Sequence, residues 1–199
     1  MMSGNGAQRR RLFTGITLTP EIRRFVAGIS EQLSTTIADV SWVPPENLHV
    51  TLKFLGGCDH DQASAIVEAM HNAAEHLPVR LQVGGVGAFP SQRSARVLWV
   101  GATDLEECIV KVYNVLDKGA EKCGFQRENR RYTPHVTIGR SRKKAVRLAP
   151  GLEESFTEKL TMKASEIVLF ESVLKSTGVE YKIVESVGPP DLRATSEKG

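Results

Sequence analysis

The feature of this sequence that most constrains its fold is a tetrapeptide that occurs twice, as His49-Val50-Thr51-Leu52 and as His135-Val136-Thr137-Ile138. Apolar and polar residues alternate in each copy, which is typical of a strand with one face in a core. Successive side chains of a strand point to opposite faces, so each His shares a face with its Thr. We therefore expect Val50, Leu52 and Phe54 to anchor the first strand in a core. The two strands would then present a matched pair of imidazoles and hydroxyls.

The N-terminal residues and the cysteine content indicate a cytoplasmic globular protein. A chain of 199 residues is expected to form one domain, or two lobes that share an interface. No apolar run approaches the roughly 18 residues of a membrane span, and residues 1–8 lack the apolar region of a signal peptide. The three cysteines have no Cys-x-x-Cys spacing, which argues against a disulfide framework and suits a reducing compartment. We expect a monomer without membrane association.

Hydrophobic periodicity predicts an α+β fold. Apolar residues recur at helical spacing from Ile22 to Leu33, whereas they alternate with polar residues in the predicted strands. We expect helices over residues 21–37, 59–77 and 104–122, and strands over residues 12–18, 49–55, 79–86, 95–100, 135–140, 156–162, 164–171 and 179–187. Because helices and strands do not alternate regularly, the sheet is expected to be mostly antiparallel, with helices packed outside. Residues 11–187 form the predicted domain, and residues 1–10 and 188–199 are predicted to be disordered.

Positive charge is concentrated around the second tetrapeptide. Between residues 127 and 147 the only acid is Glu128, against eight basic residues: Arg127, Arg130, Arg131, Arg140, Arg142, Lys143, Lys144 and Arg147. A basic cluster beside a strand end is the electrostatic signature of a site for phosphate or nucleic acid. A solvated basic loop would give the same pattern, and the position around the repeated motif is what favours a function.

Two histidines of this kind can carry out phosphoryl chemistry. An imidazole with its ordinary pKa near 6.5 is available as acid and as base at neutral pH. One His could activate water or a hydroxyl while the other protonates the departing oxygen, and each Thr hydroxyl could hold a phosphoryl oxygen. We expect no metal and no other cofactor, because zinc usually takes three or four ligands and nothing nearby completes such a set. The remaining histidines, His60, His71 and His76, are interpreted as surface residues.

The sequence resembles the two-histidine (2H) phosphoesterases, in particular the RNA 2′,3′-cyclic phosphodiesterases, which are also called 2′-5′ RNA ligases. The resemblance spans about residues 11–187 and rests on paired His-x-Thr-x motifs in their sequence contexts. The segments that carry it are Arg11–Phe13, Trp42–Gly56, Gly87–Pro90, Arg96–Val100, Thr133–Arg140, Leu169–Ser172 and Gly178–Tyr181.

This resemblance implies a two-lobed α+β fold in which the two motif strands flank a central cleft. It also implies hydrolysis of a terminal 2′,3′-cyclic phosphate of RNA to a 2′-phosphomonoester. By carry-over from the family, His49 is the proton donor to the leaving 3′-oxygen and His135 is the proton acceptor that activates water. Thr51 and Thr137 match the phosphate-holding positions. The two copies are too alike for the sequence alone to decide which His takes which role.

Secondary contacts are predicted from the chemistry of the side chains. Three arginines are candidates for holding a flanking phosphate or the RNA backbone: Arg130, Arg131 and Arg140. Strict alternation from His135 would put Arg140 on the opposite face, unless the strand ends at Gly139. Three aromatic residues could stack a base, although each also suits a core or hinge position: Phe54, Phe89 and Tyr132.

Three other functions are compatible with the same pattern. The substrate could be a small cyclic nucleotide instead of an RNA end. The protein could be a non-catalytic nucleotide- or RNA-binding module, although such a module would not need both His-Thr pairs. Finally, the two histidines could bind a metal, which would make the protein sensitive to a chelator.

Overall fold

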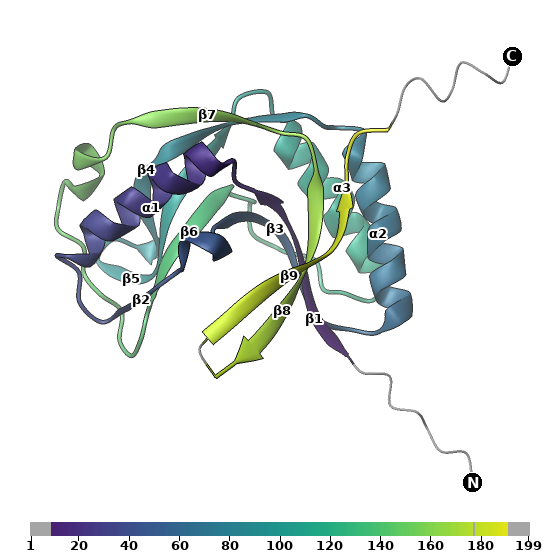
Figure 1. Ribbon diagram of the computed structural model, residues 1–199, viewed down its shortest axis with the longest axis horizontal. Helices are drawn as coiled ribbons and strands as arrows, with labels where there is room; N and C mark the ends of the chain where they lie inside the picture. The colour runs from purple at the N-terminus through teal and green to yellow at the C-terminus, as the bar shows by residue number, and fades with distance from the viewer. Residues whose placement is uncertain (1–8, 177, 191–199) are drawn as a thin grey trace, which may run out of the picture.

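The computed structural model describes residues 9–176 and 178–190, which form nine strands and three α-helices (Figure 1). The strands are β1 (Arg10–Thr17), β2 (Val40–Trp42), β3 (His49–Cys58), β4 (Val79–Ser91), β5 (Ser94–Asp104), β6 (His135–Ser141), β7 (Lys159–Ala164), β8 (Ile167–Lys175) and β9 (Gly178–Val187). The helices are α1 (Pro20–Ser34), α2 (His60–Ala74) and α3 (Cys108–Lys122), with short 3-10 turns η1 (Pro45–Asn47) and η2 (Leu152–Ser155). The predicted disordered ends lie mostly outside the described residues.

All nine strands belong to one sheet, in the order β7-β4-β5-β6-β3-β1-β8-β9, with β2 paired to β6. Every pairing among the described residues is antiparallel, which confirms the predicted class of fold. The pairing between β3 and β6, at the centre, consists of one register pair, Val50 opposite Val136. The division into two lobes stays a prediction, because the sheet continues across this join.

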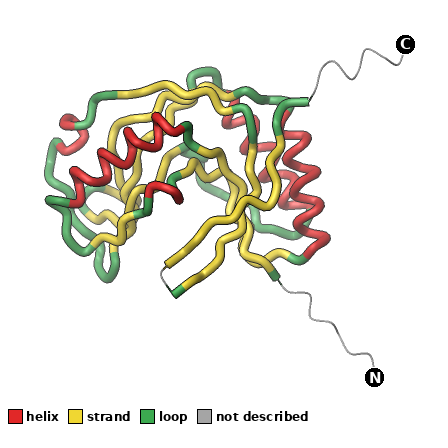
Figure 2. The backbone as a smooth tube through the Cα atoms, in the orientation of Figure 1, coloured by secondary structure: helices red, strands yellow, loops and turns green. Residues whose placement is uncertain are grey.

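The helices pack outside the sheet, on different parts of it (Figure 2). Helix α1 contacts β2, β6 and β7, whereas α2 and α3 pack on each other and against strands that include β3 and β8. Thr19 caps α1, with Pro20 in the first turn, and Asp59 forms a capping box with Gln62 at the start of α2. No helix in the described part of the chain has the length and apolar character to span a membrane.

The β4–β5 hairpin is longer than predicted. Residues 87–91, expected to be a loop, continue β4, and pairing extends to Ser91 opposite Ser94. Gly87 permits this because it has no Cβ; a Cβ at this position would lie only 2.2 Å from the Trp99 ring and clash with it. At the far end of the hairpin, Asp104 accepts a hydrogen bond from the Ile109 amide at 2.8 Å, so α3 begins at Cys108 and not at residue 104.

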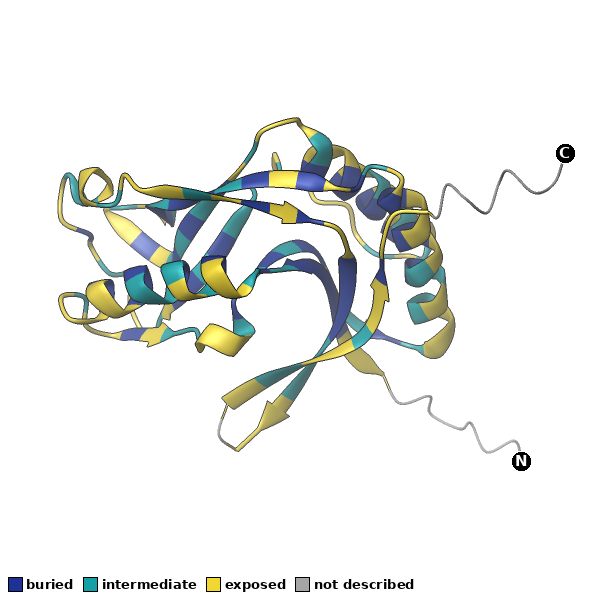
Figure 3. Ribbon diagram, turned by 45° about the horizontal axis from the view of Figure 1, so that its top comes forward, coloured by how far each residue is buried: buried dark blue, intermediate teal, exposed yellow. Residues whose placement is uncertain are grey.

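Most of the core lies between the sheet and the helices, where buried side chains follow the central strands (Figure 3). Val50, Val136 and Ile138 are fully buried, as the alternation in the two tetrapeptides predicts. A smaller buried cluster forms separately from the residues Phe13, Val168 and Phe170 on β1 and β8. The apolar face of the two motif strands therefore packs in the core, and their polar face is left for the site.

Candidate active site

The antiparallel join of β3 and β6 brings the four predicted site residues onto one face. Because Val50 lies opposite Val136, His49 lies beside Thr137 and His135 lies beside Thr51. The two histidines are then diagonal neighbours, with Cα atoms roughly 7–8 Å apart in regular sheet geometry. All four side chains are partly exposed, whereas the two valines are buried. The two imidazoles therefore stand at diagonal positions on the same face of the sheet.

Both imidazoles are held by backbone carbonyls in the same way. The Nδ1 atom of His49 lies 2.7 Å from the Asn47 carbonyl oxygen, and Nδ1 of His135 lies 2.7 Å from that of Thr133. A carbonyl can only accept, so Nδ1 carries the proton and Nε2 is the free basic nitrogen of each neutral ring. The Thr51 hydroxyl lies 3.0 Å from Nε2 of His49 and donates to it in that state.

The pKa values of both histidines lie below the ordinary value near 6.5. Burial lowers the pKa of His49 to about 4; the hydrogen bond to Asn47 opposes this shift, and the charges of His135 and Arg140 add to it. Burial also lowers the pKa of His135. The surroundings in the free protein therefore favour the neutral form of both rings more than the ordinary pKa of an imidazole would. A bound anionic phosphate would raise both pKa values.

Aromatic side chains account for the burial of His49. Its ring centroid lies 4.8 Å from that of Phe13, 5.7 Å from Phe170 and 5.2 Å from Tyr181, whose ring stands nearly perpendicular to it. These contacts place the imidazole in an apolar wall and keep water away from its edge. Sequence reasoning missed all three residues as parts of the site, because long-range pairing brings them to His49: β1 pairs with β3, β8 with β1, and β9 with β8.

His135 is enclosed by aromatic residues of the β4–β5 hairpin. Its ring centroid lies 5.1 Å from that of Phe89 and 6.1 Å from that of Trp99. The Phe89 and Trp99 rings also contact each other, at 5.3 Å. Phe89 was predicted as a stacking residue for a base, and here its edge-to-face partner is the catalytic candidate itself.

The other histidines and the cysteines lie apart from this face. His60 and His71 are exposed and His76 is partly buried, all on or just after α2. Cys58, Cys108 and Cys123 are free thiols. Among the described residues, no three His, Cys, Asp or Glu side chains gather as the ligands of a metal would.

A β-bulge interrupts both motif strands at the same place, three residues after the His. In β3, the partners of Thr14 and Gly15 are Lys53 and Thr51, so Leu52 is the extra residue. In β6, the partners of Leu98 and Trp99 are Gly139 and Thr137, so Ile138 is the extra residue. A bulge makes two successive residues share a face. Beyond it, the alternation in each strand is therefore reversed.

This reversal corrects two predictions. Phe54 does not anchor the core: it is 60% exposed, and its ring lies 5.9 Å from that of Phe13, on the side of His49. Arg140 does not lie on the opposite face, although β6 continues to Ser141; it is exposed, and its charge lowers the pKa of both His49 and His135. Phe54 and Arg140 occupy equivalent positions in the two strands, five residues after each His.

Comparison with known proteins agrees with this duplicated geometry. Two successive stretches of the chain, residues 16–99 and 100–181, match the family described as LigT like Phosphoesterase. The chain belongs to this family. The prediction of a two-histidine phosphoesterase is thereby confirmed.

Relatives of this LigT-like phosphoesterase cover most of its length. A protein of Archaeoglobus fulgidus named RNA 2′,3′-cyclic phosphodiesterase is 33% identical over 176 residues, which is 86% of this chain and 96% of the relative. A protein of the same name from Methanocaldococcus jannaschii is 29% identical over 181 residues, covering 88% and 98%. Among solved structures, TT0787 of Thermus thermophilus has a TM-score of 0.76 at 24% identity, covering 89% of this chain and 97% of that one. That likeness shows the fold.

A cavity of about 260 Å³ lies beside His135 in this LigT-like phosphoesterase. Its lining includes Thr51, Phe54, Phe89, His135 and the predicted contacts Arg130 and Arg131. A larger cavity of about 800 Å³ shares both arginines and extends along α3. The two arginines therefore border both cavities, and the segment over residues 127–134 separates one cavity from the other.

Tyr132 joins that segment to the first motif strand. Its hydroxyl donates to the Thr51 carbonyl oxygen at 2.8 Å, and its ring stacks on Tyr113 with centroids 4.2 Å apart and planes 3° apart. Burial raises the pKa of Tyr132. Tyr113 thus occupies one face of the Tyr132 ring. Among the three predicted stacking residues, Phe54 is the most exposed.

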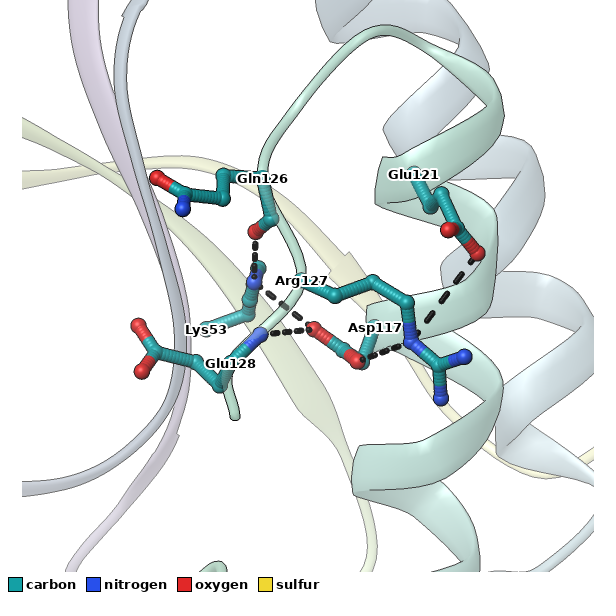
Figure 4. Close-up of polar contacts among 6 residues, drawn as sticks. All are labelled: Lys53, Asp117, Glu121, Gln126, Arg127 and Glu128. Atoms are coloured by element: carbon teal, nitrogen blue, oxygen red, sulfur yellow. Dashed lines mark hydrogen bonds and ion pairs between the residues drawn. The ribbon is translucent and has the colours of Figure 1, made fainter. Parts of the chain in front are cut away.

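A buried ion pair holds the start of the same segment (Figure 4). Lys53, on the strand of His49, donates from Nζ to Asp117 Oδ1 of α3 at 2.7 Å and to the Gln126 carbonyl at 2.7 Å. Arg127 Nε donates to the other carboxylate oxygen of Asp117 at 3.1 Å. Burial raises the pKa of Asp117, but these hydrogen bonds outweigh it and leave the pKa lowered. The pair fixes the segment that leads to His135.

Proposed function

We propose that this protein hydrolyses the terminal 2′,3′-cyclic phosphate of RNA to a 2′-phosphomonoester by metal-independent acid–base catalysis. One observation carries the proposal. Two imidazoles, each with Nδ1 held by a backbone carbonyl, share one face of the sheet with a Thr hydroxyl beside each. The relatives named RNA 2′,3′-cyclic phosphodiesterase support this choice of substrate.

In the proposed mechanism, the cyclic phosphate lies between the two rings. Nε2 of neutral His135 takes a proton from water as the water oxygen bonds to phosphorus. Nε2–H of protonated His49 gives its proton to the 3′-oxygen as the bond from phosphorus to that oxygen breaks. The 3′-hydroxyl is released and the phosphate stays on the 2′-oxygen. The same steps, with the 5′-hydroxyl of a second RNA in place of water, would join RNA ends through a 2′-5′ bond, and their reverse would cleave that bond.

The threonines and Arg140 are proposed to hold the phosphate. In the free protein the Thr51 hydroxyl donates to Nε2 of His49. Once His49 is protonated, Nε2 can no longer accept, and the hydroxyl is released to donate to a phosphoryl oxygen. The Thr137 hydroxyl would donate to a phosphoryl oxygen from the other strand. The Arg140 guanidinium would offset the negative charge of the phosphate. The anion in turn keeps the proton on His49, against the effect of burial.

The test is turnover of a short RNA that ends in a 2′,3′-cyclic phosphate, with EDTA present, from about pH 5 to about pH 9. The expected product is the 2′-phosphate, and His49→Ala and His135→Ala should each abolish its formation while leaving the fold intact. His76→Ala, a partly buried histidine after α2, is the matched control and should retain activity. Near-full activity in either site variant would rule out the paired mechanism. Binding without turnover would favour a binding module, and loss of activity with EDTA would favour a metal site.

A further inference from the structure

Six exposed cations from two distant parts of the sequence meet at one end of the sheet. Two come from the tip of the β4–β5 hairpin and four from the segment after β6; we call them the basic platform: Arg93, Arg96, Arg142, Lys143, Lys144 and Arg147. Backbone pairing brings the two segments together, through an isolated bridge of Ala95 with Val146 and a 2.9 Å bond from the Leu148 amide to the Gln92 carbonyl. Arg96 Nη1 donates to the Lys143 carbonyl at 2.9 Å.

The basic platform has little opposing charge. None of its six cations forms a salt bridge to any residue that the structure describes. The nearby acid Glu153 accepts a hydrogen bond from Gln92 at 2.7 Å, and Asp39 contacts Arg142 through its backbone carbonyl at 2.8 Å. A cluster of unpaired cations attracts a polyanion, and it loses that attraction as salt rises.

The basic platform is continuous with the catalytic face. Arg142 follows Arg140 by two residues, and Arg140 is close enough to lower the pKa of both catalytic histidines. In Figure 1 the loop after β6 lies on the side of β2 and β5, away from α2 and α3. The exposed large hydrophobic side chains of the described residues lie elsewhere. A lipid surface would call for such side chains among the cations, so a nucleic-acid backbone is the better match.

We propose that the basic platform binds backbone phosphates of the RNA on the 5′ side of the cyclic end, and so selects oligomers over mononucleotides. This inference rests on the proposed function and specifies its substrate. Because Ile138 is taken up by the bulge, six rises of about 3.3 Å put Arg142, just after β6, about 20 Å from His135. A stacked strand advances about 3.4 Å per nucleotide, so an RNA reaches the platform at a length of about seven nucleotides. Shorter substrates gain nothing from it.

The experiment compares two variants on two substrates. The platform variant carries Arg93→Gln, Arg142→Gln, Lys143→Gln and Lys144→Gln. The control variant removes the same charge from exposed lysines of α3 and β7, by Lys118→Gln, Lys122→Gln, Lys159→Gln and Lys163→Gln. The substrates are a nucleoside 2′,3′-cyclic monophosphate and a single-stranded RNA of about 15 nucleotides with the same cyclic end, assayed at about 50 and about 200 mM salt.

For the platform variant, kcat/KM on the RNA should fall about tenfold or more at low salt, while kcat/KM on the mononucleotide stays unchanged. The slope of log(kcat/KM) against log(salt) should become shallower by up to about 2.8, at about 0.7 for each lost phosphate contact. The control variant should match the unaltered protein. An equal loss on both substrates, or an equal loss in the control, would overturn the proposal.

A different outcome separates this inference from the proposed function. If the unaltered protein turns over neither substrate, the proposed function fails. The basic platform is then judged by fluorescence anisotropy with the same RNA. Weaker binding by the platform variant than by the control supports it, and equal affinity refutes it.

Discussion

Replacing Lys53 by Met should destabilise the protein, although nothing in the sequence distinguishes this lysine from other strand residues. Lys53 and Asp117 have side-chain exposures of 2% and 3%, and their charged atoms lie 2.7 Å apart. Removing one partner of a buried ion pair costs about 3–5 kcal/mol, because the other charge stays buried without compensation. Asp117 keeps the hydrogen bond from Arg127 at 3.1 Å. We therefore expect the lower end, a loss of about 3 kcal/mol in the free energy of unfolding.

Urea unfolding followed by circular dichroism measures this loss. With a slope of about 2 kcal/mol/M, the midpoint should fall by about 1.5 M. The double variant Lys53→Met, Asp117→Leu should recover most of the stability, since two apolar side chains replace the pair. Lys122→Met, an exposed lysine of α3, is the control and should change stability by less than about 0.5 kcal/mol. A single variant within about 1 kcal/mol of the unaltered protein, or a double variant less stable than the single one, would refute the reasoning.

Two further predictions concern catalysis. The pKa values of His49 and His135 both lie below 6.5 in the free protein, so the form with one protonated ring is lost as pH rises. The basic limb of the kcat/KM profile should therefore begin below about pH 6.5, and a basic limb confined to higher pH would contradict the lowered values. Thr51→Val should lower kcat by about a hundredfold by removing a hydroxyl donor to the phosphoryl oxygen. Steady-state kinetics checks this, and an unchanged kcat/KM would remove the role given to Thr51.

The strands of the site could be predicted from the sequence because their signal is local. Polar and apolar residues alternate over four residues in each motif, and this alternation predicts which side chains share a face. The structure brings His49 and His135 onto one face accordingly. The bulges could not be predicted, because a bulge depends on the register of the neighbouring strand. Alternation therefore placed Phe54 in the core, whereas Phe54 is exposed and its neighbour Lys53 is buried.

Long-range pairing accounts for the rest of what the sequence did not reveal. Tyr181 reaches His49 only because β9 pairs with β8 and β8 with β1. Arg96 joins the cations after β6 through the pairing of β5 with β6 and the bridge of its neighbour Ala95 to Val146. The sequence around Tyr181 and around Arg96 does not distinguish either residue from an ordinary strand residue. The placement of the two motifs on one face could thus be predicted from the sequence, whereas the residues that surround them depend on topology.

The matched bulges bear on how the two halves of the chain are related. The two stretches that match the family meet at the centre of the sheet, each with a His, a Thr and an extra residue at the same spacing. This is the pattern that an ancestral duplication leaves in a chain. The copies differ where the bulge turns the next side chain toward the site, with an aromatic ring at Phe54 and a cation at Arg140. Two identical half-sites would make the same contacts on both sides of a phosphate. The difference between Phe54 and Arg140 lets the two copies contact different groups of the substrate.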